Sequence, residues 1–220
     1  MNTQQTFSGS ASKLAPTLEI DLSAMGVAHI RYPSSKDADQ IISSLGQVLL
    51  KTEIRENHKS TRLLASSSGM GFHTDHNAAN YIAWFCNSQA ATGGESLLLD
   101  TTKIFAHFSE GSRMLLQEVS VKTHQVFHND KLSIPLLTID DTNQKKSVYY
   151  APWLVNTPPC SKHRRVLEKF ELEIKNATPI KLLLSEGDLL IIDNHRMLHG
   201  RNQFPANSNR WLTRYWIKSK

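Results

Sequence analysis

Residues 187–201 read Gly-Asp-Leu-Leu-Ile-Ile-Asp-Asn-His-Arg-Met-Leu-His-Gly-Arg, and this stretch carries the clearest information about the fold. The apolar run Leu189–Asp193 is short and bounded by turn residues, which predicts a β-strand. A polar turn then interrupts the strand, and the pair His199-Gly200 follows. The stretch therefore predicts a strand followed by a turn, with His199 shortly after the turn.

The same alternation of short strands and turns extends outward over most of the chain. Gly93-Gly94 and Glu186-Gly187-Asp188 are two of the turn signals. Strands are predicted over 18–22, 26–31, 81–86, 95–99, 119–127, 134–139, 148–150, 180–184, 189–193 and 210–217, and helices over 36 to about 50, 102–118 and 161–176. Many short strands with few helices predict a mainly β protein with helical insertions (α+β), folded as a double-layered sandwich or jelly roll.

Length and composition are those of a single globular domain. The chain has 220 residues, of which 40% are hydrophobic and 20% charged. These values exclude a collagen-like, coiled-coil or wholly disordered chain. Residues 1–13 are polar and are predicted to be disordered, and residues 14–220 are predicted to form one domain.

Charge and cysteine content narrow the class of protein. No apolar run approaches the roughly 18 to 20 residues that span a membrane, and residues 1–13 do not resemble a secretory signal. The net charge of +5 is small and its lysines and arginines are scattered, so no nucleic-acid partner is expected. Cys86 and Cys160 are too few for a disulfide framework. We expect reduced structural thiols in a cytoplasmic protein.

Two His-x-Asp triplets raise the question of a metal site. Chance alone yields such triplets at this composition, so their context decides between them. On an extended segment, His73 and Asp75 point the same way and can bind one ion. Gly69 and Gly71 precede them and allow a close approach of the backbone. His128-Asn129-Asp130 instead leads into a lysine-containing turn that is typical of a surface loop.

The segment after His199 carries two regularly spaced cations. If residues 210–217 form a strand, Arg210, Leu212 and Arg214 share one face. Two guanidinium groups on one face, beside a metal, would suit two anionic groups.

The ordered set of His73-Thr74-Asp75, Gly93-Gly94-Glu95-Ser96, Asp193-Asn194 to His199-Gly200-Arg201, and Arg210-Trp211-Leu212-Thr213-Arg214 resembles the taurine/2-oxoglutarate dioxygenase superfamily. This superfamily of non-haem iron oxygenases includes clavaminate synthase, amino-acid hydroxylases and γ-butyrobetaine hydroxylase. The resemblance covers roughly residues 62–216 and implies a double-stranded β-helix, cupin-like fold.

The resemblance also implies the roles of individual residues. His73, Asp75 and His199 would bind Fe(II) as a facial triad, which leaves positions for 2-oxoglutarate and O2. Arg210 falls where the family binds the distal carboxylate of 2-oxoglutarate, with Ser96 assisting. Arg214 falls where several members bind an acidic group of the substrate. The implied reaction oxidises, most often hydroxylates, an unactivated C–H bond and releases succinate and CO2.

Alternatives remain at the level of the sequence. His195 could replace His199 as a ligand, although the glycine after His199 and its spacing to Arg210 favour His199. A zinc hydrolase could use the same triad, and a non-catalytic cupin-like binding module could retain it. The expected partner is a small molecule, either an amino acid or an acyl group tethered to a carrier. Four aromatic side chains are expected mainly in the core, namely Trp84, Tyr150, Trp153 and Trp216, although Tyr150–Trp153 is also a candidate lid.

Overall fold

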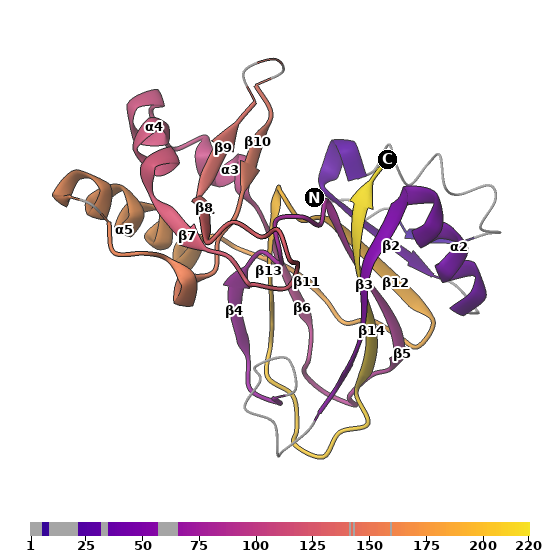
Figure 1. The fold of residues 1–220 in the computed structure, drawn as a ribbon. Coiled ribbons are helices and arrows are strands. Elements are labelled where there is room, and N and C mark those ends of the chain that lie inside the picture. Colours follow the sequence, from indigo (N-terminus) through magenta and orange to yellow (C-terminus); the bar gives the residue numbers. More distant parts are fainter. Residues whose placement is uncertain are drawn as a thin grey trace.

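The protein is described by a computed structural model that covers residues 6–8, 22–31, 35–56, 66–140, 142, 144–158 and 160–220. Two mainly antiparallel sheets pack against each other as a double-stranded β-helix, or jelly roll (Figure 1). The larger sheet has the order β1 (Thr6–Ser8), β2 (Val27–Arg31), β12 (Asp188–Asp193), β5 (Tyr81–Ser88), β14 (Trp211–Ser219) and β3 (Gly46–Arg55). The smaller sheet has the order β11 (Ile180–Leu182), β6 (Ser96–Asp100), β13 (Met197–Arg201) and β4 (Met70–His73). The predicted mainly β jelly roll is confirmed.

Strand β12 shows how the sequence produces the two layers. Its side chains alternate between the two faces of the larger sheet. Leu190 and Ile192 pack between the sheets, where Leu98 and Met197 of the smaller sheet join them. Leu189 and Ile191 pack on the opposite face. Both faces are buried, which explains why β12 is a continuous apolar run.

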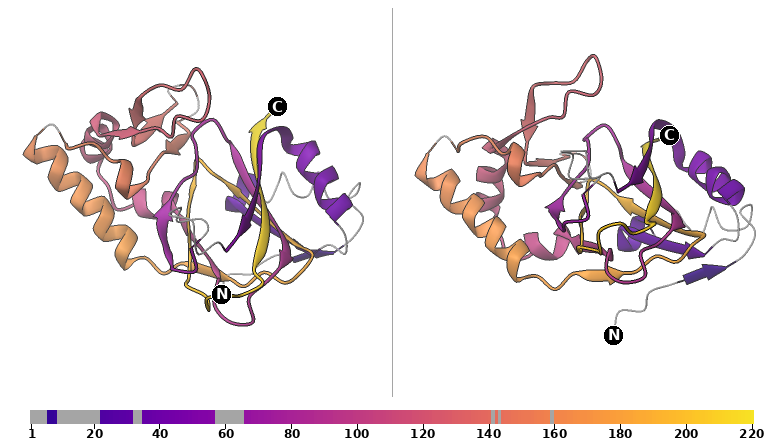
Figure 2. Two further views of the ribbon diagram at one scale, coloured as in Figure 1. Left: turned by 60° about the horizontal axis from the view of Figure 1, so that its bottom comes forward. Right: turned by 90° about the horizontal axis from the view of Figure 1, so that it is seen from below.

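The outer face of the larger sheet is covered by α2 (Ser35–Leu45). Ile41 and Ile42 of this helix are each 1% exposed and pack against Tyr215 and Ile217 of β14. Figure 2 shows α2 and the long helix α5 (Ser161–Asn176) on opposite sides of the molecule. Strand β14 therefore packs against a helix with one face and borders the space between the sheets with the other.

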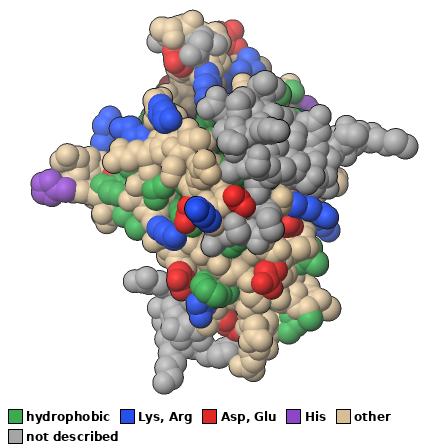
Figure 3. All heavy atoms as spheres, turned by 90° about the vertical axis from the view of Figure 1, so that its right-hand side faces the viewer, with side chains coloured by type: hydrophobic (Ala, Val, Ile, Leu, Met, Phe, Trp, Pro, Cys, Tyr) green, Lys and Arg blue, Asp and Glu red, His purple; other side chains and the backbone are tan. Residues whose placement is uncertain are grey.

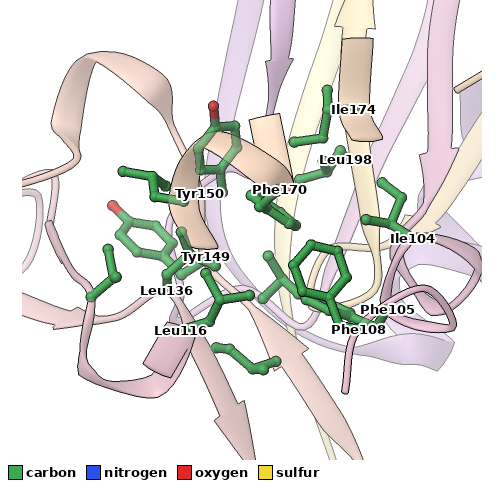
Figure 4. Packing of buried hydrophobic residues seen from close by; sticks show 14 of the residues in the cluster. Ile104, Phe105, Phe108, Leu116, Leu136, Tyr149, Tyr150, Phe170, Ile174 and Leu198 are labelled. Atoms are coloured by element: carbon green, nitrogen blue, oxygen red, sulfur yellow. The ribbon is translucent and has the colours of Figure 1, made fainter. Parts of the chain in front are cut away.

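A second region packs against the smaller sheet. It contains α3 (Thr101–Phe105), α4 (Glu110–Glu118), β7 (Ser120–Lys122), β8 (Ser133–Pro135), β9 (Leu137–Ile139), β10 (Lys146–Val148), the 3-10 helix η2 (Pro152–Leu154) and α5. Figure 4 shows its core, in which Phe170 of α5 packs among aromatic side chains. Leu198 joins this core from β13. Leu198, which directly precedes the predicted ligand His199, therefore packs in the core of the helical region.

Several predicted boundaries are wrong. The helix predicted to end near residue 50 stops at Leu45, because Gly46 has a φ of 157° and a side chain there would lie 2.0 Å from the Lys218 carbonyl oxygen. The chain then forms β3 as a partner of β14. The helix predicted over 102–118 is divided by Ser109, which caps α4 by accepting from the Ser112 N–H.

Two predicted strands are also shorter than expected, and others were missed. The strand predicted over 119–127 is reduced to β7, and the one over 134–139 is divided between β8 and β9, which pair with different strands. Strands β3, β4 and β13 were not predicted as strands. The strand predicted over 18–22 lies outside the described residues except for Leu22, which begins a helical turn. Of the segment 1–13, the structure describes Thr6–Ser8 as β1.

Charged side chains of both signs are interspersed on the described surface, as the sequence predicts. On the face at the right of Figure 1, lysine and arginine side chains alternate with aspartate and glutamate (Figure 3). Across the ranges that the structure describes, none of the helices has the length and apolar character needed to cross a bilayer.

Candidate active site

The three predicted metal ligands lie together at the pairing of β4 with β13. His73 ends β4 and faces His199 in the antiparallel register. Their ring centroids are 4.3 Å apart. Asp75 follows two residues after His73, and one donor atom from each of the three side chains lies within 4.8 Å of the others. All three residues are buried, at 5 to 7% exposure.

A glycine next to one ligand allows this close pairing. The β13–β4 register shifts between His199 and Arg201, which marks a bulge. A side chain at Gly200 would place its Cβ 2.7 Å from the Met70 carbonyl oxygen of β4. Only glycine lets the two strands approach here, so Gly200 sets the distance between the two histidines.

Both imidazoles are prepared to act as neutral ligands. Burial lowers the pKa of His73, and burial together with repulsion from His73 lowers the pKa of His199 to about 3. His73 Nδ1 lies 2.9 Å from the Gly71 carbonyl oxygen and donates to it, which leaves the Nε2 lone pair for an ion. His199 Nδ1 is buried without a hydrogen-bond partner in the described residues.

Asp75 is held by two donors from β14. Arg214 Nη1 lies 3.0 Å from both of its carboxylate oxygens, and Trp216 Nε1 donates to Oδ2 at 2.8 Å. Burial raises the pKa of Asp75, but the opposing effect of its neighbours, led by the charge of Arg214, holds that pKa below its usual range. The carboxylate is therefore ionised and fixed in orientation.

The backbone around Asp75 is fixed from the turn after β12. Asn194 is fully buried, and its Oδ1 accepts from the Asp75 N–H at 2.9 Å. Its Nδ2 donates to the carbonyl oxygens of His76 and Ala79 at 3.1 and 3.0 Å. From its place in the polar turn after residues 189–193, Asn194 is expected only to stabilise that turn. The structure shows that it joins this turn to the segment that carries Asp75.

A cavity of about 500 Å³, part of it open to solvent, adjoins the two histidine ligands. Its polar lining includes His73, His199, Ser96, Arg210 and Arg214. Its apolar lining consists of Ile54, Met70, Trp84, Leu98 and Leu212. The predicted common face of residues 210, 212 and 214 is confirmed, since all three line this cavity.

Arg210 is a buried cation without an anionic partner. It is 5% exposed, and its Nε donates to the neutral amide oxygen of Gln89 at 3.0 Å. Among the described residues no Asp or Glu side chain pairs with it, and burial together with the charge of Arg201 lowers its pKa to about 10. A buried charge in this state is costly unless an anion joins it.

The donor set fits a divalent iron ion. Two neutral imidazoles and one ionised carboxylate on adjacent strands form a two-histidine, one-carboxylate set with one open side, which suits Fe(II). His199 Nε2 lies 4.0 Å from Asp75 Oδ1, beyond hydrogen-bond distance, so its lone pair is available to an ion. Because the ligands are already in their deprotonated forms, binding needs no proton to be removed at neutral pH.

The structure separates the other candidate residues from this set. His195 lies outside it, with its Nε2 2.9 Å from the Asn77 carbonyl oxygen, and His128 is exposed. Ser96 begins β6 and pairs with Arg201 at the cavity wall. Arg214 lines the cavity but faces Asp75, and its predicted contact with a substrate stays a prediction.

Other side chains border the ligands, and from the sequence they are expected only in the core or a lid, or have no expected role. The Trp153 ring lies 5.2 Å from that of His73 and is 46% exposed, so this member of the candidate lid is not in the core. The Trp84 ring lies 5.0 Å from that of His199. His124 is partly buried and close enough to Asp75 for that charge to act on its pKa, which burial lowers. A two-residue alternation from Arg214 would have placed Trp216 on the site face.

Solved structures share this fold. A non-heme iron oxygenase, OrfP, in complex with Fe and alpha-ketoglutaric acid superposes with a TM-score of 0.79 at 16% identity, covering 95% of this chain and 80% of that chain. An asparagine oxygenase in complex with Fe(II), 2S,3S-3-hydroxyasparagine and succinate gives 0.76 at 16% identity, covering 94% and 79%. At such identities the likeness concerns the fold.

Sequence comparison is more direct. The 3-((Z)-2-isocyanoethenyl)-1H-indole synthase of Fischerella ambigua is 30% identical over an alignment of 177 residues, and the match covers 70% of this chain and 65% of that protein. This chain thus spans just under two thirds of that curated relative. Residues 26–216 match the family described as taurine catabolism dioxygenase TauD, TfdA family. The chain therefore belongs to the TauD/TfdA family of 2-oxoglutarate-dependent non-haem iron oxygenases.

Proposed function

We propose that the protein is an Fe(II)- and 2-oxoglutarate-dependent dioxygenase that hydroxylates an unactivated C–H bond of a small, carboxylate-bearing or amino-acid-like molecule. The observation that carries this proposal is one cavity lined by His73, His199 and the cation Arg210, which has no anionic partner among the described residues, with Asp75 completing the donor set beside the two histidines. Iron bound there would supply the oxidation by activating dioxygen, with 2-oxoglutarate as the source of electrons and succinate and CO2 as products.

Arg210 would bind the distal carboxylate of 2-oxoglutarate. Its buried guanidinium can form two parallel, charge-assisted hydrogen bonds with a carboxylate. Ser96 lines the same cavity and can donate its hydroxyl proton to one carboxylate oxygen. Leu98 and Leu212 would pack against the methylene groups of the co-substrate and exclude water from it.

Arg214 and Trp216 would orient the metal ligand Asp75. Their contacts with Asp75 orient its carboxylate, so that one lone pair faces the open side of the three ligands. Fixing the ligand before an ion binds reduces the cost of ordering it. A carboxyl group of the substrate could still approach the far edge of the Arg214 guanidinium from the cavity.

The substrate class rests on the relatives and on the cavity. The solved neighbours include complexes with hydroxylated asparagine and hydroxylated arginine. The curated relative from Fischerella ambigua is named for an indole product with an ethenyl group, so desaturation is a second possible outcome at a site of this kind. The exposed Trp153 ring beside His73 offers a flat apolar surface to a side chain of the substrate.

The test is a succinate-release screen. Protein reconstituted with Fe(II) and 2-oxoglutarate is offered free amino acids, their N-modified derivatives, betaines, sulfonates and carrier-tethered acyl groups. We expect succinate above the substrate-free level with one chemical class. Mass spectrometry then distinguishes gain of one oxygen atom from loss of two hydrogen atoms.

Metal exchange and a ligand variant discriminate the alternatives. Turnover restored by Fe(II) with ascorbate but not by Zn(II) supports the oxygenase and excludes the zinc hydrolase. His199→Ala should remove turnover. Failure of the wild-type protein to bind 2-oxoglutarate in the presence of Fe(II), measured anaerobically by its visible absorbance, would exclude the oxygenase and leave the zinc hydrolase and the non-catalytic binding module.

A further inference from the structure

A second group of titratable side chains lies outside the candidate iron site, at the junction of α4 and α5. Cys160 Sγ is 3.0 Å from His163 Nδ1, and His163 Nε2 is 2.8 Å from Glu118 Oε2. The imidazole thus contacts a thiol with one ring nitrogen and a carboxylate with the other. A nucleophile, a base and a carboxylate that orients the base, hydrogen-bonded in this order, form the arrangement that activates a cysteine.

The packing of two helices creates this group. Cys160 occupies the N-cap position of the 16-residue helix α5, and its side chain makes no capping hydrogen bond. His163 lies in the first turn of α5, where the spacing of three residues brings both side chains to one face. Glu118 is the last residue of α4. Cys160 is exposed, whereas only 7% of His163 is exposed. The thiol is therefore open to solvent while its partner is held in place.

The arrangement is unlike a metal site. The thiol and the carboxylate bind opposite nitrogens of the ring, so the three groups cannot converge on one ion. Within the described part of the chain, the one cluster of three donors close enough for an ion is the set around His199.

The electrostatic environment favours the thiolate. The backbone N–H and imidazole of His163 and the N–H of Lys162 lower the pKa of Cys160 to about 7. Contacts with Cys160 and Glu118 raise the pKa of His163. Burial, in contrast, raises the pKa of Cys86 to about 11. The chain thus contains one accessible thiol with a lowered pKa and one buried thiol with a raised pKa.

We propose that Cys160 is a modification site, at which the Cys160–His163–Glu118 group undergoes exchange with a low-molecular-weight disulfide of the glutathione disulfide class. His163 takes the thiol proton, and the Cys160 thiolate attacks one sulfur of the disulfide. A bond forms between Cys160 Sγ and that sulfur as the original S–S bond breaks. The electron pair leaves with the second sulfur, which accepts the proton from His163. Cys160 is oxidised to the mixed disulfide, and half of the reagent is reduced to a free thiol.

The first experiment locates the adduct. The full chain is treated anaerobically with glutathione disulfide, so that the disulfide is the sole oxidant, and intact and peptide masses are measured. We expect one adduct, on Cys160, that Cys160→Ser removes and the matched variant Cys86→Ser retains. An adduct on Cys86, or none on folded protein, would overturn the proposal.

The second experiment tests the role of the partners. The alkylation rate of Cys160 with iodoacetamide should follow a single titration with a midpoint near pH 7. His163→Gln should slow disulfide exchange at pH 7 by about fivefold, because the loss of thiolate exceeds the gain in intrinsic nucleophilicity. Glu118→Gln, at an exposed carboxylate that leaves the helix intact, should slow it less. A midpoint near that of an ordinary thiol, with the rates of both variants equal to wild type, would show that the group does not activate Cys160.

Discussion

Arg214 Nη1 lies 3.0 Å from both carboxylate oxygens of Asp75, so the side chain expected to receive a substrate already contacts a metal ligand. Both side chains are buried, with side-chain exposures of 6% and 7%. A pair of this kind is held by geometry as well as by charge, and removal of one partner leaves the other charge uncompensated. Arg214 and the metal therefore act on the same carboxylate.

This contact gives the first prediction. Arg214→Ala should weaken the binding of Fe(II) by about 10- to 100-fold, the usual effect of losing a residue that orients a ligand. Anaerobic metal titration measures it, with Mn(II) as a redox-stable substitute. Arg164→Ala, at an exposed position of α5, is the control. Unchanged metal affinity combined with a raised KM for the primary substrate would contradict this prediction. It would show instead that Arg214 binds the substrate, as the sequence suggested.

The second prediction compares two histidines four residues apart. His199→Ala should abolish coupled turnover and reduce Fe(II) affinity by more than about tenfold, because a direct ligand is lost. His195→Ala should retain Fe(II) affinity, because that ring contacts the Asn77 carbonyl oxygen. Circular dichroism checks that both variants fold. Loss of metal binding in His195→Ala alone would show that the ligand is misassigned.

The third prediction concerns the co-substrate. Arg210→Ala should raise the KM for 2-oxoglutarate at least about tenfold, since a charge-assisted contact contributes about 1.5 to 3 kcal/mol. Arg210→Lys should recover part of the loss, because an ammonium group cannot present two parallel donors. Steady-state kinetics at saturating Fe(II) provide the measurement. If Arg210→Ala keeps the wild-type KM while Arg214→Ala loses 2-oxoglutarate binding, the two arginines have exchanged roles.

The fourth prediction uses the lowered pKa of His199. The folded, metal-free protein holds this pKa at about 3, whereas the ordinary value is 6.5. Between these values the unfolded chain binds more protons, so the free energy of unfolding falls as the pH falls from 6.5 toward 3. One such group contributes at most about 1.4 kcal/mol per pH unit.

Urea unfolding of metal-free protein between pH 7 and pH 4 tests this relation. His199→Gln removes the titrating ring, so its stability should decline less steeply with acid than that of the wild type. The comparison of slopes cancels the other titrating groups that the two proteins share. Parallel pH profiles would contradict the assigned pKa.

The fifth prediction concerns the helical region shown in Figure 4. Phe170 is fully buried, and its ring centroid lies 5.6 Å from that of Phe105 and 5.3 Å from that of Tyr150. Phe170→Ala should lower the free energy of unfolding by about 3 to 5 kcal/mol. Leu172→Ala on the same helix is the matched control, because Leu172 is 54% exposed. Equal effects of the two changes would contradict the packing of α5.

The sequence revealed those parts of the site that are local in the chain. His73 and Asp75 are two residues apart on an extended segment, and that spacing, together with Gly69 and Gly71 before it, suggested that they bind one ion. The contact between Asp75 and Arg214 was missed because it depends on how β14 crosses the site, which no local pattern encodes. Asn194 was assigned to its own turn for the same reason, since its partners lie more than one hundred residues earlier.

The errors in the fold have a related cause. The helix predicted to continue to about residue 50 has suitable apolar spacing, but Gly46 and pairing with β14 convert its last turn into β3. Strand β13 contains a glycine and follows a polar turn, so it lacks the apolar signal of β12. Tertiary pairing determined both segments, and local propensity was the weaker influence.

The place of β12 between β2 and β5 governs how the protein must fold. Residues 188–193 pair between two strands that lie much earlier in the sequence. His199 comes shortly after these residues and pairs with His73. Such non-local pairings make folding slow, because loops must close before contacts form. The donor atoms converge only after β13 has docked, so an ion added during refolding binds too late to accelerate it. Iron should instead lengthen the lifetime of the native state by slowing unfolding.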